Sequence, residues 1–466
     1  MRRVLYSRFE PSNMTRVLFM ENTRIQQALE AATETNAFIT GEGCRRDTPR
    51  IFQQHFPGAT AIIIADDNTF HAAGKTVLEC LQHSDIHVLE PFIFPGTPTL
   101  HAEYKHVEAL KGLLETQPDV IPIAVGSGTV NDLVKRSVSE LDRRYMVVAT
   151  AASVDGYSSS GAPIVQNGFK KTMPCPAPLA IVADIEVLRE APFKMTAAGY
   201  ADLMSKVPAG ADWIVADFVG EDPIQSPIWT MIQPPLKTWL GAPEQLQKGD
   251  AQALEFLFEG LTMTGFAMQA MNSSRPASGA DHLLSHILDM QHHRDAEGQS
   301  VSHGFQVSIG TLGSTALMEV VFARDIRQLD IDALCQRWKS WEEREREIRQ
   351  AFEGTPIIDR VVVECRAKYI PADQLRKRLE QISGGWDMLN RKVKEQLFPY
   401  QQLKTMLQAA DCPVAPEQIN LPKEHLRELY TLAQMIRNRY TILDLAYELG
   451  WLEECVEEII ASDMYL

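Results

Sequence analysis

Histidine and carboxylate side chains recur in the middle of this sequence at spacings that suit a metal ion. His282 and His286 are four residues apart, so one helix would present both on the same face, and His303 follows after a loop. Asp202 and Lys206 repeat the four-residue spacing earlier in the chain. Imidazole and carboxylate ligands with an open position hold catalytic Zn²⁺ or Fe²⁺. These residues therefore indicate a metal centre.

Two other interpretations of the histidines must be weighed. The segment from His282 to His286 is similar to the helix of zinc proteases, but Leu283 stands where that chemistry needs a glutamate base. We therefore exclude a protease of that kind. A helical pair of histidines is also compatible with a structural or solvent-exposed role, and the spacing alone leaves this alternative open.

A glycine-containing turn follows an apolar segment and precedes an expected helix. Its residues are Gly126, Ser127, Gly128, Thr129 and Val130. Glycines let a backbone approach a pyrophosphate, and the N–H groups of a first helical turn bind its oxygens. The third glycine of the usual dinucleotide fingerprint is missing, so a simple tight turn between strand and helix remains an alternative.

Two further polar segments follow expected strands, where open parallel sheets bind ligands. Asp66 could accept a hydrogen bond from a ribose hydroxyl, whereas Asp67 or Asn68 could instead cap a helix. The segment 150–160 carries six hydroxyl groups and the carboxylate of Asp155. It is a candidate ligand loop, with an ordinary polar loop as the alternative.

Apolar segments and helical periodicity alternate in the first part of the chain. This rhythm predicts a parallel sheet covered by helices. The expected strands are Ala59–Ala65, Ile86–Leu89, Val120–Val125, Tyr145–Thr150 and Leu179–Val182, and the expected helices are Thr69–Gln82, Leu100–Thr116 and Asn131–Leu141.

After about Leu188 the pattern becomes helical. Only Ile357–Val363 is ambiguous, as a short strand or the start of a helix. The remaining segments are expected to be helices: Leu203–Phe218, Ala251–Met271, His282–His292, Gly310–Arg324, Ile331–Phe352, Pro371–Ile382, Lys423–Leu449 and Leu452–Ile460. We therefore expect two domains, residues 1–188 and 189–466, in a chain too long for one core.

Composition limits the possible partners. The chain has 466 residues and a formal net charge of −16, so nucleic acid and anionic membranes are poor partners. No apolar stretch approaches the ~20 residues of a membrane span, and Met1–Met20 is not expected to be a signal peptide. The seven cysteines form no C-x-x-C pair, which favours a reducing compartment. We expect a cytoplasmic protein.

Several blocks together resemble the sn-glycerol-1-phosphate dehydrogenase family, within the iron-containing alcohol dehydrogenase and dehydroquinate synthase-like superfamily. The blocks cover most of the chain in the family's order. They are AVGSGTVNDLVK (124–135), TAASVDGYSSSGAP (150–163), PLAIVADIEVLREAPFKMTAAGYADLMSK (178–206), SRPASGADHLLSH (274–286), HG (303–304) and RNRYTILDLAYELGWL (437–452).

The resemblance implies a dehydroquinate synthase-like fold. Its N-terminal α/β domain, residues 1–188, would bind NAD or NADP. Its all-α C-terminal domain, residues 189–466, would bind metal and substrate, with the active site in the interdomain cleft. The implied cofactor contacts are Asp66, Gly126, Ser127, Gly128, Thr129, Val130, Thr150, Ser153 and Ser159.

The same resemblance assigns the ligands of one divalent ion to Asp202, His282 and His303. Asp155, Asp202 and His286 would contact substrate and act in catalysis. The implied reaction is the reversible, NAD(P)H-dependent reduction of dihydroxyacetone phosphate to sn-glycerol 1-phosphate, a step of phospholipid metabolism. A homodimer is also implied. Zn²⁺, Ni²⁺ and Fe²⁺ remain open as the ion, and so do the residues that bind phosphate, with Arg275, Lys170 and Lys206 as candidates.

Three other functions remain as alternatives. A dehydroquinate synthase-like lyase would use the same cofactor and metal. A glycerol or polyol dehydrogenase would act without recognising a phosphate group. An inactive binding protein is the third alternative, but it would not need three intact metal ligands. Two local departures from the family bear on the site. Pro208 could break the helix after Lys206, and residues 295–302 could be an insertion near the site.

Overall fold

The computed structural model describes residues 4–7, 23–166, 169–462 and 464. Most of the segment Met1–Met20 lies outside the described residues. The chain divides into two compact units, residues 1–203 with 230–274, and residues 204–229 with 275–466. Each unit is described separately below.

A seven-stranded sheet forms the centre of the first unit. Its order is β1-β2-β9-β6-β5-β3-β4, and every pair is parallel except β1 with β2. A separate hairpin joins β7 and β8. The strands are β1 Val4–Ser7, β2 Ala37–Gly41, β3 Thr60–Asp66, β4 Phe92–Phe94, β5 Val120–Gly126, β6 Met146–Ala149, β7 Ala162–Gln166, β8 Phe169–Met173 and β9 Ala180–Asp184.

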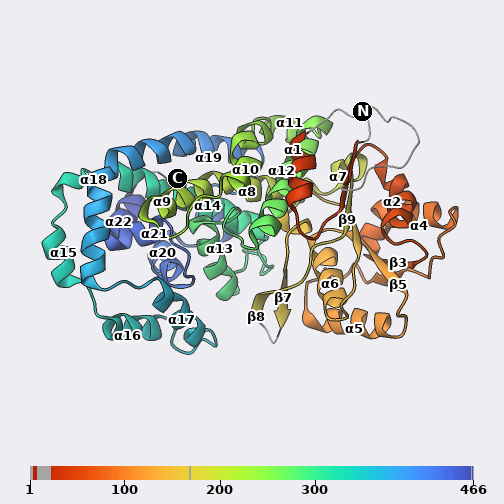
Figure 1. Cartoon of the computed structure of the whole chain (residues 1–466), viewed down its shortest axis with the longest axis horizontal. Coiled ribbons are helices and arrows are strands. Elements are labelled where there is room, and N and C mark those ends of the chain that lie inside the picture. Colours follow the sequence, from red (N-terminus) through yellow and green to blue (C-terminus); the bar gives the residue numbers. More distant parts are fainter. Residues whose placement is uncertain (1–3, 8–22, 167–168, 463, 465–466) are drawn as a thin grey trace. The chain divides into compact units, whose positions relative to one another are not determined.

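Helices cover both faces of this sheet. Alternate residues of β3 and β5, such as Ile63 and Ile123, form one buried core with Phe52 of α2 and Leu81 of α4. Figure 1 shows α2 and α4 on one side of β3 and β5, and α5 and α6 on the other. The helices are α1 Thr23–Ala31, α2 Thr48–His55, α3 Asp67–Thr69, α4 Lys75–Gln82, α5 Tyr104–Glu115, α6 Gly128–Ser139, α7 Ile185–Glu190, α8 Phe193–Met204, α10 Ser226–Trp239, α11 Pro243–Gln247 and α12 Ala251–Met271. Short 3-10 helices lie at Cys44–Asp47 and Asp155–Tyr157, and a π-helical turn lies at Phe70–Gly74.

The regular elements in the described part of the second unit are helices, and one isolated bridge joins Arg294 and Ser300. Helix α14 is long and apolar enough to cross a membrane by length and composition, but it is mostly buried inside the protein, as a core helix is. The helices are α9 Lys206–Val219, α13 Ala280–Met290, α14 His303–Ala323, α15 Ile331–Arg337, α16 Trp341–Ala351, α17 Ile358–Lys368, α18 Ala372–Gln396, α19 Tyr400–Ala409, α20 Leu426–Met435, α21 Ile442–Glu448 and α22 Leu452–Ala461, with short turns at Ile326–Gln328, Pro416–Ile419 and Lys423–His425.

Sheet and helices confirm the expected fold class, with local corrections. The strand expected at Ile86–Leu89 is wrong: within it only Val88 makes a bridge, with Ala61, and the strand that pairs with β3 is β4. The ambiguous segment Ile357–Val363 belongs to helix α17. The long helix expected over Ile331–Phe352 is two helices, because the side chain of Ser340 caps a new N-terminus.

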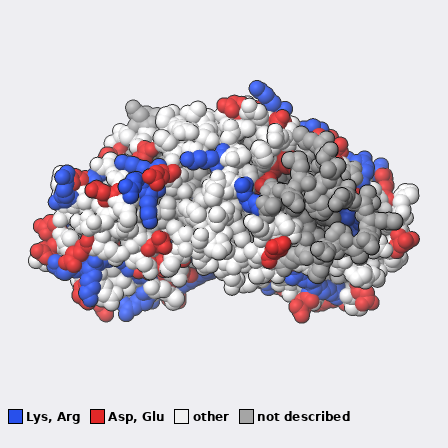
Figure 2. Space-filling model, turned by 45° about the horizontal axis from the view of Figure 1, so that its top comes forward, with Lys and Arg blue, Asp and Glu red and all other residues white. Residues whose placement is uncertain are grey.

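Charge is mixed on the visible surface. On the face shown in Figure 2, basic and acidic side chains are interspersed, and no continuous basic area covers its described part.

Candidate active site

The three expected metal ligands come together. One ligand atom each from Asp202, His282 and His303 lies within 4.8 Å of the others. Asp202 lies in the last turn of α8, His282 in the first turn of α13, and His303 is the first residue of α14. Asp202 and His282 are buried, and His303 is partly buried. Residues 101 positions apart in the sequence thus converge as a single donor set.

A break in the helix follows Asp202. The continuous helix expected over Leu203–Phe218 is wrong, since α8 ends at Met204 and α9 begins at Lys206. Pro208 has no N–H to donate to the Met204 carbonyl, and its ring opposes that carbonyl in a regular helix. The break expected from Pro208 is therefore confirmed, and Asp202 and Lys206 lie on two helices.

A second carboxylate orients His282. The Nδ1 of His282 donates a hydrogen bond to Asp281, whose other oxygen accepts from the backbone N–H of Gly279 at 3.1 Å. Burial raises the pKa of Asp281 to about 7, opposed by the charge of Lys206. With Nδ1 engaged, Nε2 is the nitrogen that would bind an ion, as in metal sites where a carboxylate supports the histidine.

His303 has a comparable support. Its Nδ1 lies 3.4 Å from the hydroxyl of Ser285, which donates to the Gln306 side chain at 3.2 Å. The hydroxyl of Ser302 accepts from the N–H of Phe305 and so fixes the start of α14. With Nδ1 near Ser285, Nε2 is the nitrogen of His303 that would bind an ion, as for His282.

His286 lies one helical turn beyond His282. Their ring centroids are 6.2 Å apart, and those of His282 and His303 are 5.2 Å apart. Burial, with a smaller contribution from the charge of His282, lowers the pKa of His286 well below its ordinary value. A neutral imidazole is therefore present beside the donor set at neutral pH.

The polar loop 150–160 is tied to Asp202. The backbone N–H of Asp155 donates to Oδ2 of Asp202 at 2.9 Å. Behind it, the fully buried ammonium of Lys135 donates to the carbonyls of Gly156, Ser159 and Gly161 at 2.8, 2.9 and 3.1 Å. Three carbonyls on one cation fix the path of this loop and so the place of Asp155.

Two glycines allow helices to approach the same loop closely. A Cβ at Gly199 of α8 would lie 1.9 Å from the carbonyl oxygen of Ala152, and one at Gly265 of α12 would lie 2.0 Å from the hydroxyl of Ser158. That hydroxyl donates to the Thr262 carbonyl at 2.8 Å. Helices α8 and α12 therefore both pack closely against the loop at these glycines.

The glycine turn lies beside this loop. The N–H of Thr150 donates to the Gly126 carbonyl at 3.1 Å, and a Cβ at Gly128 would lie 3.1 Å from Val154. Ser127 precedes α6 in an extended conformation and makes no side-chain cap, while Val130 packs under Gly126, where a Cβ would clash at 2.4 Å. The first N–H groups of α6 thus have the arrangement that binds phosphate oxygens.

Two other expected cofactor residues, Asp66 and Ser159, have local partners. Asp66 ends β3 and accepts from the N–H of Thr69 at 2.8 Å in a capping box, so a capping role belongs to Asp66 rather than to Asp67 or Asn68. The hydroxyl of Ser159 donates to the Gly156 carbonyl at 3.3 Å. Both side chains therefore form hydrogen bonds within their own turns. This agrees with the alternatives to cofactor contact, a helix cap at Asp66 and an ordinary polar loop at Ser159.

The donor set suits a divalent ion. One carboxylate and two imidazoles, with the ring nitrogens fixed by Asp281 and Ser285, are ligands for Zn²⁺, Ni²⁺ or Fe²⁺. Three protein ligands leave a coordination position for substrate, which distinguishes a catalytic from a structural site. The residues therefore fit the ion that the resemblance implies.

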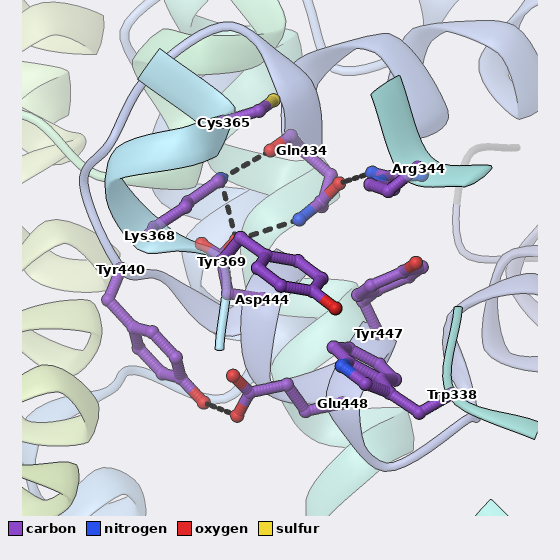
Figure 3. Close-up of a pocket in the computed structure, with 10 residues that line it drawn as sticks. All are labelled: Trp338, Arg344, Cys365, Lys368, Tyr369, Gln434, Tyr440, Asp444, Tyr447 and Glu448. Carbon is purple, nitrogen blue, oxygen red and sulfur yellow. Dashed lines mark hydrogen bonds and ion pairs between the residues drawn. The ribbon is translucent and has the colours of Figure 1, made fainter. Parts of the chain in front are cut away.

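A separate polar pocket lies in the second unit (Figure 3). Its cavity of about 30 Å³ has room for about one water molecule. Its polar groups contact one another: Lys368 pairs with Asp444 at 2.6 Å, and the Tyr440 hydroxyl donates to Glu448 at 2.7 Å. The pocket contains no residue of the expected site, and its small volume excludes a cofactor.

Sequence reasoning missed the residues that support the ligands. Lys135 and Gly199 stand inside the resembling blocks, but nothing in their local pattern shows which carbonyls they contact. Asp281 also stands inside a resembling block, but the sequence predicted no role for it. An acid directly before a ligand histidine is a usable signal, because such histidines commonly donate to a carboxylate.

Known proteins of similar sequence indicate the family to which the chain belongs. The family model described as iron-containing alcohol dehydrogenase matches residues 39–192. The glycerol-1-phosphate dehydrogenase (NAD(P)+) of Geobacillus thermodenitrificans is 34% identical over 325 residues, covering 70% of this chain and 77% of the relative. The enzyme of the same name from Geobacillus stearothermophilus is 29% identical over 394 residues, covering 84% and 87%.

Solved structures share the fold at low sequence identity. An NADH-dependent butanol dehydrogenase from Thermotoga maritima matches with a TM-score of 0.56 at 14% identity, covering 93% of this chain and 98% of that one. A probable glycerol dehydrogenase from Sinorhizobium meliloti gives 0.55 at 13%, covering 91% and 97%. The resemblance drawn from the sequence blocks is confirmed: the chain belongs to the glycerol-1-phosphate dehydrogenase family.

Proposed function

We propose that this protein is a metal-dependent oxidoreductase that reversibly reduces dihydroxyacetone phosphate to sn-glycerol 1-phosphate with NADH or NADPH. The observation that carries the proposal is the convergence of Asp202, His282 and His303, in a chain whose relatives are named for this activity. A bound divalent ion would polarise the ketone oxygen, and a bound nicotinamide would supply the hydride.

The chain's own residues would bind and orient the reactants. Residues 1–188 would bind the nucleotide, with its pyrophosphate at Gly126–Val130 and further contacts from Asp66, Thr150, Ser153 and Ser159. Residues 189–466 would supply the histidine ligands. Asp155 would contact the substrate hydroxyls, held in place by its backbone bond to Asp202.

Proton transfer would fall to His286. Its lowered pKa keeps the ring neutral, so it can accept the proton of the alcohol during oxidation and return it during reduction. Asp202 would act twice, as metal ligand and as acceptor for the Asp155 N–H, which couples the position of the ion to that of the substrate loop.

The cellular setting is also part of the proposal. All seven cysteines are free, which suits the reducing conditions of the cytoplasm. A homodimer is expected from the family resemblance, and light scattering of the purified protein would test it.

The deciding experiment measures NADH and NADPH oxidation with dihydroxyacetone phosphate and, in parallel, with dihydroxyacetone. The protein is assayed as purified, after chelation, and after return of Zn²⁺, Ni²⁺ or Fe²⁺. We expect oxidation with the phosphorylated ketone, its loss on chelation and its recovery with one of the ions. Equal rates on both ketones would identify a polyol dehydrogenase, and no oxidation of either would overturn the proposal.

A further inference from the structure

A short irregular segment between α20 and α21, residues 436–441, is fixed at several points although it forms no regular element. The backbone N–H of Asn438 donates to a carboxylate of α17 at 3.0 Å. The guanidinium of Arg439 donates to the carbonyl of Ser278 at 2.7 Å, and the carbonyl of Tyr440 accepts from Arg275 at 2.9 Å. The segment is therefore rigid and positioned.

The hydroxyl end of Tyr440 gives the segment one more anchor. It donates to Glu448 in the polar pocket, as Figure 3 shows. The Arg439 contact at Ser278 lies just before the N-terminus of α13, the helix that carries His282 and His286. The segment thus connects the polar pocket to the start of the helix that bears the candidate site.

Arg437 differs from its neighbours on this segment. Within the described part of the chain its guanidinium makes no hydrogen bond or ion pair, although the side chain is partly buried. Burial and the nearby charge of Arg360 lower the pKa of Arg437, and Glu364 opposes them. A partly desolvated cation that no anion contacts directly is stabilised when a ligand supplies a hydrogen-bonded anion.

The charge of Arg437 reaches the candidate site. Helix α20, which ends just before the segment, packs against α13. The charge of Arg437 is one of the charges that lower the pKa of His286. Arg437 thus follows directly on a helix that contacts α13 and precedes by two residues the Arg439 contact at Ser278, which places it beside the helix that bears His286.

The other cations considered for a phosphate are engaged elsewhere. Arg275 donates to the carbonyls of Tyr440 and Asp212, and Arg439 donates to Ser278. Lys206 is fully buried, with its ammonium 3.3 Å from the Ser205 hydroxyl. The side chain of Lys170 lies outside the described residues.

We propose that Arg437 binds the phosphate group of the substrate and thereby selects the phosphorylated ketone over the free one. The inference rests on the proposed function for the identity of the substrate. An arginine on a fixed backbone can give a phosphate two parallel hydrogen bonds, and its orientation is set before the ligand arrives.

The test compares Arg437→Gln with Arg437→Lys and with a matched control, Arg360→Gln, which removes the neighbouring exposed cation on α17. For each holoenzyme, kcat/KM is measured with dihydroxyacetone phosphate and with dihydroxyacetone. Inorganic phosphate binding is measured separately by calorimetry, without turnover.

We expect Arg437→Gln to lower kcat/KM for the phosphorylated ketone by about 10- to 100-fold, mainly through KM, while leaving the free ketone unchanged. Arg437→Lys should restore part of the loss, and Arg360→Gln should behave as wild type. Equal losses on both ketones, or unchanged phosphate binding in Arg437→Gln, would overturn the proposal. If wild type reduced neither ketone but bound phosphate through Arg437, the proposed function would fail and the anion site would stand.

Discussion

The most informative structural perturbation is Lys135→Met, because one buried cation holds the loop that positions Asp155. Lys135 is fully buried and donates to three carbonyls at 2.8–3.1 Å. Methionine has a similar length and no donor, so three buried carbonyls would lose a charged partner. Breaking a buried charged contact of this kind costs about 3–5 kcal/mol.

The expected loss is large enough to measure directly. At about 2–4 °C per kcal/mol, Lys135→Met should lower the melting temperature by roughly 6–20 °C. Nicotinamide nucleotide affinity should fall as well, because the released loop lies beside the glycine turn. Differential scanning fluorimetry and NADH fluorescence titration report the two effects.

A surface lysine provides the control. Lys111 of α5 pairs with Glu115 and Glu140 near solvent, so Lys111→Met should change stability by less than ~1 kcal/mol. If Lys135→Met melted with the wild type and bound NADH equally well, the three carbonyl contacts would not hold the loop, and the reasoning would be refuted.

Three further predictions follow from single contacts. Gly199→Ala would place a methyl group 1.9 Å from the Ala152 carbonyl oxygen, so we expect a lower melting temperature. An unchanged melting curve would contradict the close approach of α8 to this carbonyl. Asp281→Asn should weaken Co²⁺ binding by about 10- to 100-fold in a chelator competition, with an altered visible spectrum; wild-type affinity would show that this carboxylate does not support the ligand. Burial raises the pKa of Cys175 and of Cys455 to about 11, so both thiols stay protonated below about pH 10. We therefore expect both to resist iodoacetamide at pH 8. Mass spectrometry should find the modification at the less buried Cys80 and Cys335 instead.

The sequence predicted those parts of the fold that depend on local pattern. Ile62, Ile63 and Ile64 form a continuous apolar run, and this predicted a strand buried on both faces. Short edge elements were not predictable in this way. Strand β4 has three residues and becomes a strand only by pairing with β3, which no local pattern reveals.

The site shows the same division. The residue types and family blocks identified Asp202, His282 and His303, and the structure brings them together. The supporting contacts depend on which backbone atoms lie nearby, as for Lys135 and its carbonyls, and this follows only from the tertiary fold. Arg437 stood in a recognised block, but its lack of a partner is a property of the folded chain.

The central claim is that Asp202, His282 and His303 hold one catalytic ion. Anomalous scattering from crystals grown with Zn²⁺, measured at the zinc edge, tests it most directly. The account predicts one strong peak about 2.0–2.2 Å from a carboxylate oxygen of Asp202 and from Nε2 of both histidines. A peak at other residues, or none at these three in a protein that reduces dihydroxyacetone phosphate, would contradict it.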